Sequence, residues 1–329
     1  MSHTNGKIAF LIYDQRSGST ILARKITEKL NGVVVPDCHF LIKILIRFNH
    51  NQKIDNLTRI EIKNIFESDR TISDWEINGE IIREITNTDN KYIYDFIKRI
   101  IYLLRKKYKL EPDEYLILKK ESYIFLKHVI LDIFPELLFI GITRDPRAVF
   151  ASKKNSLYTG TGTPFTRSSI RAAFDWRLYR ERCKKLVSEP ITFIEVSYEN
   201  LILKPDTELV KIAKVIGVRN QNNNREFNLP SRYEKIHKNV MKEMDVSKIE
   251  KWKNEISLLE KIFIEILCVE KILDAGYKPR FLKIQIFYPF IFMLSNSLYM
   301  FCLLIFRMRS SLRWTKDLIT LEQFDDTNI

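Results

Sequence analysis

The chain has 329 residues, of which 45% are hydrophobic and 29% are charged, with only nine glycines and ten prolines. This composition excludes a disordered or fibrous protein and provides enough apolar residues for one large α/β domain with appendages, or for two domains. The net charge of +13 favours anionic partners, namely phosphorylated cofactors, nucleic acids or acidic lipid headgroups. Four scattered cysteines without a CxxC pair and five dispersed histidines indicate neither a zinc site nor a disulfide framework, so we expect a reducing compartment.

Four short apolar runs predict the β-strands of the fold. They cover residues 7–13, 115–118, 137–143 and 191–197. The first run is only six apolar residues long before Asp14 interrupts it, so it indicates a strand and not a signal peptide. A helix-like segment follows each run, and this βα alternation predicts a parallel sheet with helices on its faces. Ligands of such sheets bind at the carboxyl ends of the strands.

Three helical regions stand out along the chain. Leu22, Ile26 and Leu30 repeat with the helical period directly after the first strand. Residues 50–110 have helical patterning without a strand signal, and we interpret them as a helical insertion over the sheet. A further apolar repeat over residues 247–275 predicts one long helix, which Gly276 and Pro279 end.

The segment between the first strand and its helix has the composition of an anion-binding loop. Unpaired backbone N–H groups and the positive end of the helix dipole point out of such a loop together. Gly18 permits close backbone approach, and Arg16 brings a guanidinium suited to phosphate-like oxygens. The hydroxyl donors of the loop are Ser17, Ser19 and Thr20. The alternative is a plain turn with a Ser or Thr helix cap.

A second charged segment follows the third predicted strand. Asp145 and Pro146 predict a helix start directly after Arg144, at the carboxyl end of that strand. Ser152 lies about two helical turns beyond Asp145, so its side chain returns to the same helix face. Arg144 and Ser152 can therefore hold one anion. The alternative is a capped helix with Arg144 in a surface salt bridge.

Together, the two segments resemble the PAPS-dependent sulfotransferases, which use 3′-phosphoadenosine 5′-phosphosulfate. The run RSGSTILARKI is similar to the family's 5′-phosphosulfate loop, and RDPRAVFAS is similar to its 3′-phosphate motif. The run VSYENL, which contains Tyr198, resembles the family's V-x-Y-E-D-L strand end. The segment from Lys251-Trp252-Lys253 to Ala275-Gly276-Tyr277 resembles its C-terminal helix. The similarity extends over about residues 7–278.

The resemblance implies a P-loop-like α/β fold with a parallel sheet flanked by helices, in a sulfotransferase domain over residues 1–280. It also implies PAPS as cosubstrate, an in-line transfer of the sulfuryl group to an acceptor hydroxyl without a metal, and no nucleic-acid partner. Saccharides, lipids and peptides all remain possible acceptors, with carbohydrate or lipid favoured. The residues implied to bind the nucleotide are Arg16, Ser17, Gly18, Ser19, Thr20, Arg144, Ser152, Tyr198 and Lys242.

The same resemblance gives candidates for the catalytic groups. The tyrosylprotein branch places a glutamate where this chain has Asp37, and His39 follows two residues later. Asp37 is the preferred general base, His39 is the second candidate, and neither is a third possibility. The family's K-[TD]-P lysine, which assists the leaving group, corresponds to Lys120 or to Lys119, with Lys120 preferred. Glu121-Ser122 replaces the usual small residue and proline.

The C-terminal part of the chain, residues 281–329, is hydrophobic at first and ends in an acidic tail. Residues 284–306 are twenty-three residues without a charge, flanked on both sides by basic residues. A straight helix of that length, at about 1.5 Å per residue, spans a bilayer. A spanning helix, an interfacial hairpin bent at residues 295–297, and a core or dimer helix are all open. We favour an anchor on the cytoplasmic face of a membrane, because PAPS is made in the bacterial cytosol.

Two other functions remain open. A kinase of the same architecture requires a lysine-bearing P-loop and magnesium, and the pattern GxxxxGK[ST] is absent from the sequence. A non-enzymatic, membrane-associated nucleotide-binding protein would keep the loops and lack the base.

Overall fold

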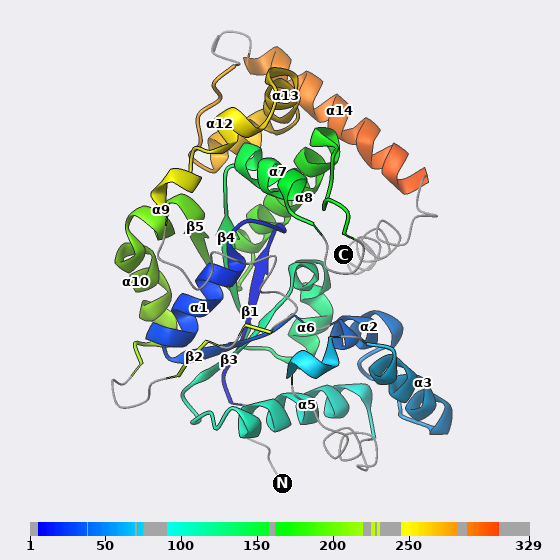
Figure 1. Cartoon of the computed structure of the whole chain (residues 1–329). Coiled ribbons are helices and arrows are strands. Elements are labelled where there is room, and N and C mark those ends of the chain that lie inside the picture. The colour runs from blue at the N-terminus through cyan, green and yellow to red at the C-terminus, as the bar shows by residue number, and fades with distance from the viewer. Residues whose placement is uncertain are drawn as a thin grey trace.

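The computed structural model describes residues 6–37, 39–69, 71–75, 91–157, 162–219, 225–227, 229–230, 245–281 and 288–308. Its centre is a five-stranded parallel sheet in the order β2-β3-β1-β4-β5 (Figure 1). The strands are β1 (Ile8–Tyr13), β2 (Gly32–Val35), β3 (Tyr115–Lys119), β4 (Leu138–Thr143) and β5 (Thr192–Ser197). The parallel α/β class predicted from the sequence is thus confirmed. The expected number of four strands is wrong, because β2 adds a fifth.

Helices cover both faces of the sheet (Figure 1). Side chains of β1 alternate between these faces, as in any strand. Ile8, Phe10 and Ile12 belong to one core cluster, and Ala9, Leu11 and Tyr13 belong to the other. The first cluster includes residues of α2 (Phe40–Arg47), α3 (Asn56–Glu67), α5 (Ile93–Lys107), the 3₁₀ helix η2 (Glu121–Leu126), α6 (Lys127–Ile133) and α8 (Ser169–Val187). The second includes residues of α1 (Ser19–Lys29), α9 (Tyr198–Leu203) and α10 (Pro205–Ile216).

The expected helical insertion is helical where the structure describes it, and it packs on the first face. Phe66 of α3, Trp75 at the end of the 3₁₀ helix η1 (Ile72–Trp75) and Phe96 of α5 are buried in this cluster. Residue 70 and residues 76–90 of this region lie outside the described part of the chain.

The long helix expected over residues 247–275 is instead broken into three pieces. They are the 3₁₀ helix η3 (Val246–Lys248), α12 (Trp252–Glu255) and α13 (Leu258–Asp274). The break has a local cause, because Ser257 is the N-cap of α13 and forms a capping box with Glu260. A third core cluster joins α12 and α13 to α7 (Pro146–Asn155) and α8.

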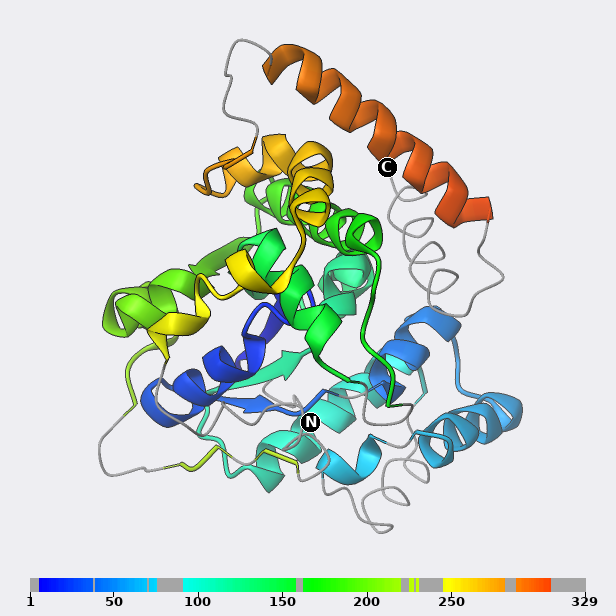
Figure 2. The same ribbon diagram turned by 45° about the horizontal axis from the view of Figure 1, so that its top comes forward.

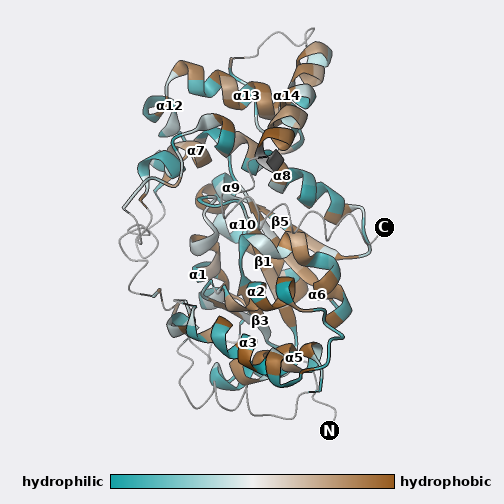
Figure 3. Ribbon diagram, turned by 90° about the vertical axis from the view of Figure 1, so that its right-hand side faces the viewer, coloured by the Kyte–Doolittle hydropathy of each residue, from teal (hydrophilic) through white to brown (hydrophobic). Residues whose placement is uncertain are grey.

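The apolar C-terminal segment forms α14 (Tyr288–Met308), one continuous helix and not a hairpin bent at residues 295–297. Figure 2 shows α14 at the outer edge of the molecule, beyond α13 and α8 as seen from the sheet. By length and composition, α14 is the one helix of the described residues that could cross a membrane. The hydropathy colouring in Figure 3 shows apolar residues along most of it.

Candidate active site

The loop after β1 has the backbone of an anion-binding turn. Arg16 (φ 72°) and Gly18 (φ 95°) both adopt left-handed conformations, and the Ser17 N–H donates to the Asp14 carbonyl at 3.1 Å. Gly18 is the N-cap of α1, and no side chain caps this helix. The alternative of a Ser or Thr cap is therefore not what the structure shows. The Ser17 hydroxyl oxygen is fully buried and has no hydrogen-bond partner among the described residues.

The second predicted segment meets this loop. The Arg16 Nε donates to the Ser152 Oγ at 3.2 Å, and Arg144 Nη1 donates to the Arg16 carbonyl oxygen at 3.2 Å. The Arg144 guanidinium lies 4.1 Å from the ring centroid of Tyr198. That ring also covers Gly18, where a Cβ atom would come within 2.3 Å of it. Four residues predicted to bind the nucleotide, namely Arg16, Arg144, Ser152 and Tyr198, are thus linked by direct contacts at this loop.

The electrostatics of this cluster favour an anionic ligand. Burial, with the nearby charge of Arg144, lowers the pKa of Arg16 to about 10. No carboxylate within the described residues forms an ion pair with either guanidinium, so the alternative of a surface salt bridge for Arg144 does not hold there. The Arg144 Nε is buried and unpaired within the same residues. Two cations with no counter-ion in the described part of the chain predict an anionic ligand that lies between them.

The helix that carries Ser152 starts as the sequence predicts. Asp145 caps α7 by accepting from the Arg147 N–H at 2.9 Å, and Pro146 is the first helical residue. Arg147 itself turns away from the loop, because its buried guanidinium pairs with Asp145 at 2.6 Å and with Glu265 of α13 at 2.5 Å. This pairing holds α7 against α13.

A buried ion pair joins the start of the same loop to α7. Asp14 accepts from Lys153 at 2.7 Å, and Lys153 is the neighbour of Ser152. Burial raises the pKa of Asp14 to about 6, although the charge of Lys153 opposes this shift. The pair therefore links the start of the loop to the middle of α7.

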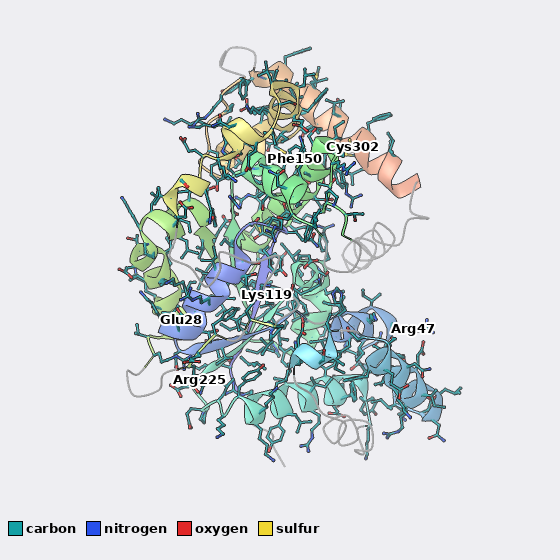
Figure 4. All side chains as sticks on the ribbon, in the orientation of Figure 1. Glu28, Arg47, Lys119, Phe150, Arg225 and Cys302 are labelled. Atoms are coloured by element: carbon teal, nitrogen blue, oxygen red, sulfur yellow. The ribbon has the colours of Figure 1, made fainter. Side chains whose placement is uncertain are left out.

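The carboxyl ends of β2 and β3 bring a second group of charges together. The Asp37 carboxylate accepts from Lys119 Nζ at 2.8 Å and from the Tyr13 hydroxyl at 2.8 Å, so both of its oxygens are engaged. Burial raises the pKa of Asp37, but Lys119 and Lys120 outweigh burial and hold the pKa below its ordinary value. Figure 4 labels Lys119 near the centre of the molecule.

Next to this pair lie Lys120 and a residue that the sequence did not single out. Lys120 Nζ donates to Glu121 Oε1 at 3.0 Å, and Gln15 Nε2 of the loop donates to the same oxygen at 2.9 Å. Glu121 was noted only as a departure from the family motif. Its position, directly after a lysine doublet at a strand end, was the available signal.

Burial, followed by the charge of Lys120, lowers the pKa of His39, so its ring is neutral at pH 7.

The two C-terminal resemblances also meet in space. The Glu199 carboxylate accepts from the Tyr277 hydroxyl at 2.6 Å and from the Asp145 N–H at 3.1 Å. Burial raises the pKa of Glu199. This contact ties the end of β5 and the segment after α13 to the start of α7. Lys242, predicted to contact the nucleotide, lies outside the described residues.

Metal-ligating residues do not gather in the parts of the chain that the structure describes. No three or more His, Cys, Asp or Glu residues of these parts come close enough to hold a metal ion.

Comparisons with known proteins agree with this geometry. No curated protein matches the sequence. The sulfotransferase domain from the Synechococcus PCC 7002 olefin synthase is similar in structure, with 19% identity, a TM-score of 0.53, and coverage of 84% of this chain and 98% of that one. The sulfotransferase domain from the curacin biosynthetic pathway has 14% identity, a TM-score of 0.52 and coverage of 84% and 99%. At these identities the likeness shows the fold alone.

The family model described as the sulfotransferase family matches residues 10–222, from β1 to beyond α10. This range contains both candidate anion-binding segments, Lys119 at the end of β3 and Lys120 directly after it. Family and fold together support sulfotransfer as the activity. The chain belongs to the sulfotransferase family.

Proposed function

We propose that this protein transfers a sulfuryl group from 3′-phosphoadenosine 5′-phosphosulfate to the hydroxyl of a saccharide or lipid acceptor. The observation that carries this proposal is the pair of guanidinium groups, Arg16 and Arg144, which meet beside Ser152 without a carboxylate partner among the described residues. Two separated anionic groups on one ligand, as in PAPS, match two cations held at the N-terminus of a helix.

Each half of the site has a role in this proposal. The loop over residues 14–20 would hold the 5′-phosphosulfate with its backbone N–H groups and hydroxyls, including the unpaired Ser17 hydroxyl. Arg144 and Ser152 would hold the 3′-phosphate, with Tyr198 fixing the guanidinium of Arg144 from one side. Lys242 stays a sequence-based prediction for the same ligand.

Transfer to an acceptor also requires a group that takes its proton. Asp37 is the preferred candidate, because its low pKa keeps it ionised at pH 7. His39 is the second candidate, because it is neutral at that pH. Both follow β2, next to the loop that would hold the sulfuryl group.

Binding of the product nucleotide PAP tests this function directly. PAP should raise the Tm, and ATP with magnesium should raise it much less, because the loop has no P-loop lysine. Arg144→Ala should weaken PAP binding. Arg24→Ala is the matched control, since Arg24 pairs with Glu28 within α1, the helix that follows the loop. Unchanged PAP affinity in Arg144→Ala would show that the 3′-phosphate assignment is wrong. A dependence on ATP and magnesium would favour a kinase, and binding without PAPS turnover would favour a binding protein.

We also propose that α14 lies on a membrane surface, at the cytoplasmic face. One side of this helix exposes large apolar residues, with Phe290 at 63% and Phe301 at 59% exposed. The others on that side are Met293, Leu294, Met300 and Leu304. Such a continuous apolar stripe on a protein of net charge +13 fits acyl chains and acidic headgroups.

The opposite side of α14 is attached to the domain, which argues for a flat position and against a spanning helix. Arg177 of α8 donates to the Ser295 hydroxyl at 2.8 Å and to Asn296 Oδ1, and it lies 4.2 Å from the Tyr299 ring centroid. The polar residues of the segment thus bind a buried arginine of the globular part. A division into a sulfotransferase domain over residues 1–280 and a membrane-associated segment over residues 281–329 is part of this proposal.

Vesicle flotation tests the membrane proposal. The double variant Phe290→Glu/Phe301→Glu should lose binding to vesicles that contain acidic lipid and keep PAP binding. Leu57→Glu/Ile60→Glu is the matched control, because these α3 residues are equally exposed on another helix. If the wild-type chain ignores vesicles, or if the control loses binding equally, the stripe on α14 is not a membrane surface.

A further inference from the structure

The end of β3 carries two consecutive lysines that the structure separates. Neighbouring residues of an extended chain point to opposite sides, and Lys119 and Lys120 donate their hydrogen bonds to different carboxylates. Lys119 lies 4.9 Å from the Tyr13 ring centroid and pairs with Asp37 at 2.8 Å. Lys120 pairs with Glu121 at 3.0 Å. Each lysine therefore has its own acidic partner.

The partner of Lys120 also reaches the anion-binding loop. Glu121 Oε1 accepts from Lys120 and from Gln15, which lies between Asp14 and Arg16 in that loop. The backbone fixes this position, since the Lys120 N–H donates to the Leu11 carbonyl of β1 at 3.1 Å. One carboxylate oxygen thus joins the end of β3 to the loop.

We propose that Glu121 is a positioning residue, which holds Lys120 toward the loop over residues 14–18, while Lys119 holds Asp37. This inference rests on the proposed sulfuryl transfer and assigns the two lysines to its two halves. It also gives a reason for a glutamate where the resembled motif has a small residue. The side chains of Lys120 and Glu121 are only 6% and 14% exposed, so an unpartnered Lys120 would pay a large desolvation penalty in this position.

In the proposed sulfuryl transfer, Lys120 acts at the leaving group and Lys119 acts through Asp37 at the acceptor. The charge of Glu121 does not change in this reaction. The acceptor oxygen forms a bond to sulfur while the bond from sulfur to the 5′-phosphate oxygen breaks, and the electron pair stays on that phosphate oxygen. Lys120 donates a hydrogen bond to the developing charge there. The proton of the acceptor hydroxyl passes to Asp37, whose carboxylate Lys119 and Tyr13 orient. Glu121 neither takes nor gives a proton.

Variant kinetics with PAPS and a panel of methyl glycosides and long-chain alcohols test this role, with PAP release as the readout. Glu121→Ala should lower kcat by about tenfold or more, and it should change the KM for PAPS by less than about threefold, because the lost contact matters most in the transition state. Glu121→Gln should recover most of kcat, since its amide oxygen still accepts from Lys120 and Gln15. Glu28→Ala on α1 is the matched control and should leave kcat unchanged.

Double variants show whether Glu121 affects kcat by positioning Lys120 or independently of Lys120. Glu121→Ala/Lys120→Ala should be no slower than Lys120→Ala alone, whereas the losses from Glu121→Ala and Lys119→Ala should multiply. A Glu121→Gln variant as slow as Glu121→Ala would overturn the inference in favour of proton transfer by Glu121. Multiplying losses for Glu121 and Lys120 would overturn it as well. A wild-type chain that releases no PAP from PAPS would overturn the proposed function first, and this inference with it.

Discussion

Removal of the Arg16 charge should stabilise the protein in the absence of nucleotide, and it should weaken nucleotide binding. The pKa of Arg16 falls from its ordinary value to about 10, because the guanidinium is buried and lies near Arg144. The folded state therefore holds this proton less tightly than the unfolded state, and the charged form opposes folding at pH 7. A shift of this size corresponds to about 3 kcal/mol of the free energy of unfolding.

Arg16→Gln removes that charge and leaves a shorter, neutral polar side chain. The variant loses the hydrogen bond to Ser152, which contributes about 1 kcal/mol. The net expectation is a gain of about 1–2 kcal/mol in the free energy of unfolding without ligand, measured by urea unfolding. PAP affinity, measured by calorimetric titration, should fall by about 10- to 100-fold, since a charge-assisted hydrogen bond is lost.

The control for this experiment is Arg24→Gln, whose guanidinium already pairs with Glu28 at 2.6 Å. It should change neither the stability by more than about 0.5 kcal/mol nor the PAP affinity. An Arg16→Gln protein that is less stable than the wild type and binds PAP equally well would refute the interpretation of the cluster as an anion site.

Two further predictions concern the parts of the fold that support the site. Arg177→Ala should lower the free energy of unfolding by about 3 kcal/mol or more in chemical denaturation, because a buried arginine that bonds Ser295 and the Leu267 carbonyl is lost. Arg171→Ala, in a half-exposed pair on the same helix, should cost much less, and equal losses would contradict the docking role. Burial raises the pKa of Asp14 to about 6, so the folded state holds this proton more tightly than the unfolded state. As the pH rises from 4 to 6, the wild type should therefore lose about 2 kcal/mol of stability relative to Asp14→Asn, and parallel pH profiles would show that Asp14 does not titrate in this way.

The sequence predicted the site best where one short motif contains its own structural context. Asp145-Pro146 determines the start of α7, so the distance from Arg144 to Ser152 follows from helix geometry. Arg16 was a candidate for the same site, but its direct contact with Ser152 was not predicted. Only the packing of β1 beside β4 brings Arg16 to Ser152, because these residues are 136 positions apart.

Two errors came from signals that were present in the sequence. The strand β2 is the run Gly32-Val33-Val34-Val35, whose three β-branched residues favour a strand, although the run is only four residues long. Ser257 and Glu260 were the signal for the break before α13, because they form a capping box inside an otherwise helical apolar repeat. In both cases a long-range apolar pattern hid a local signal.

Other features depend on tertiary structure alone. The pairing of Lys119 with Asp37 joins the end of β3 to the segment that follows the neighbouring strand β2, and no spacing rule predicts it. The role of Ser295 and Asn296 is similar, because polar residues within an apolar run can bend a helix or bind a partner. The position of Arg177 on α8 decides between these outcomes.

The contact between Glu199 and Tyr277 affects the order in which parts of the site fold during synthesis. The two residues are 78 positions apart, and Glu199 also accepts from the Asp145 N–H at the start of the helix that carries Ser152. During synthesis the sheet and both anion-binding segments leave the ribosome before Tyr277 does. A nascent chain at that stage lacks the Tyr277 hydroxyl that donates to Glu199, the carboxylate that also holds the start of α7. The nucleotide should therefore bind weakly to partial chains, and completion of the site should be among the last steps of folding.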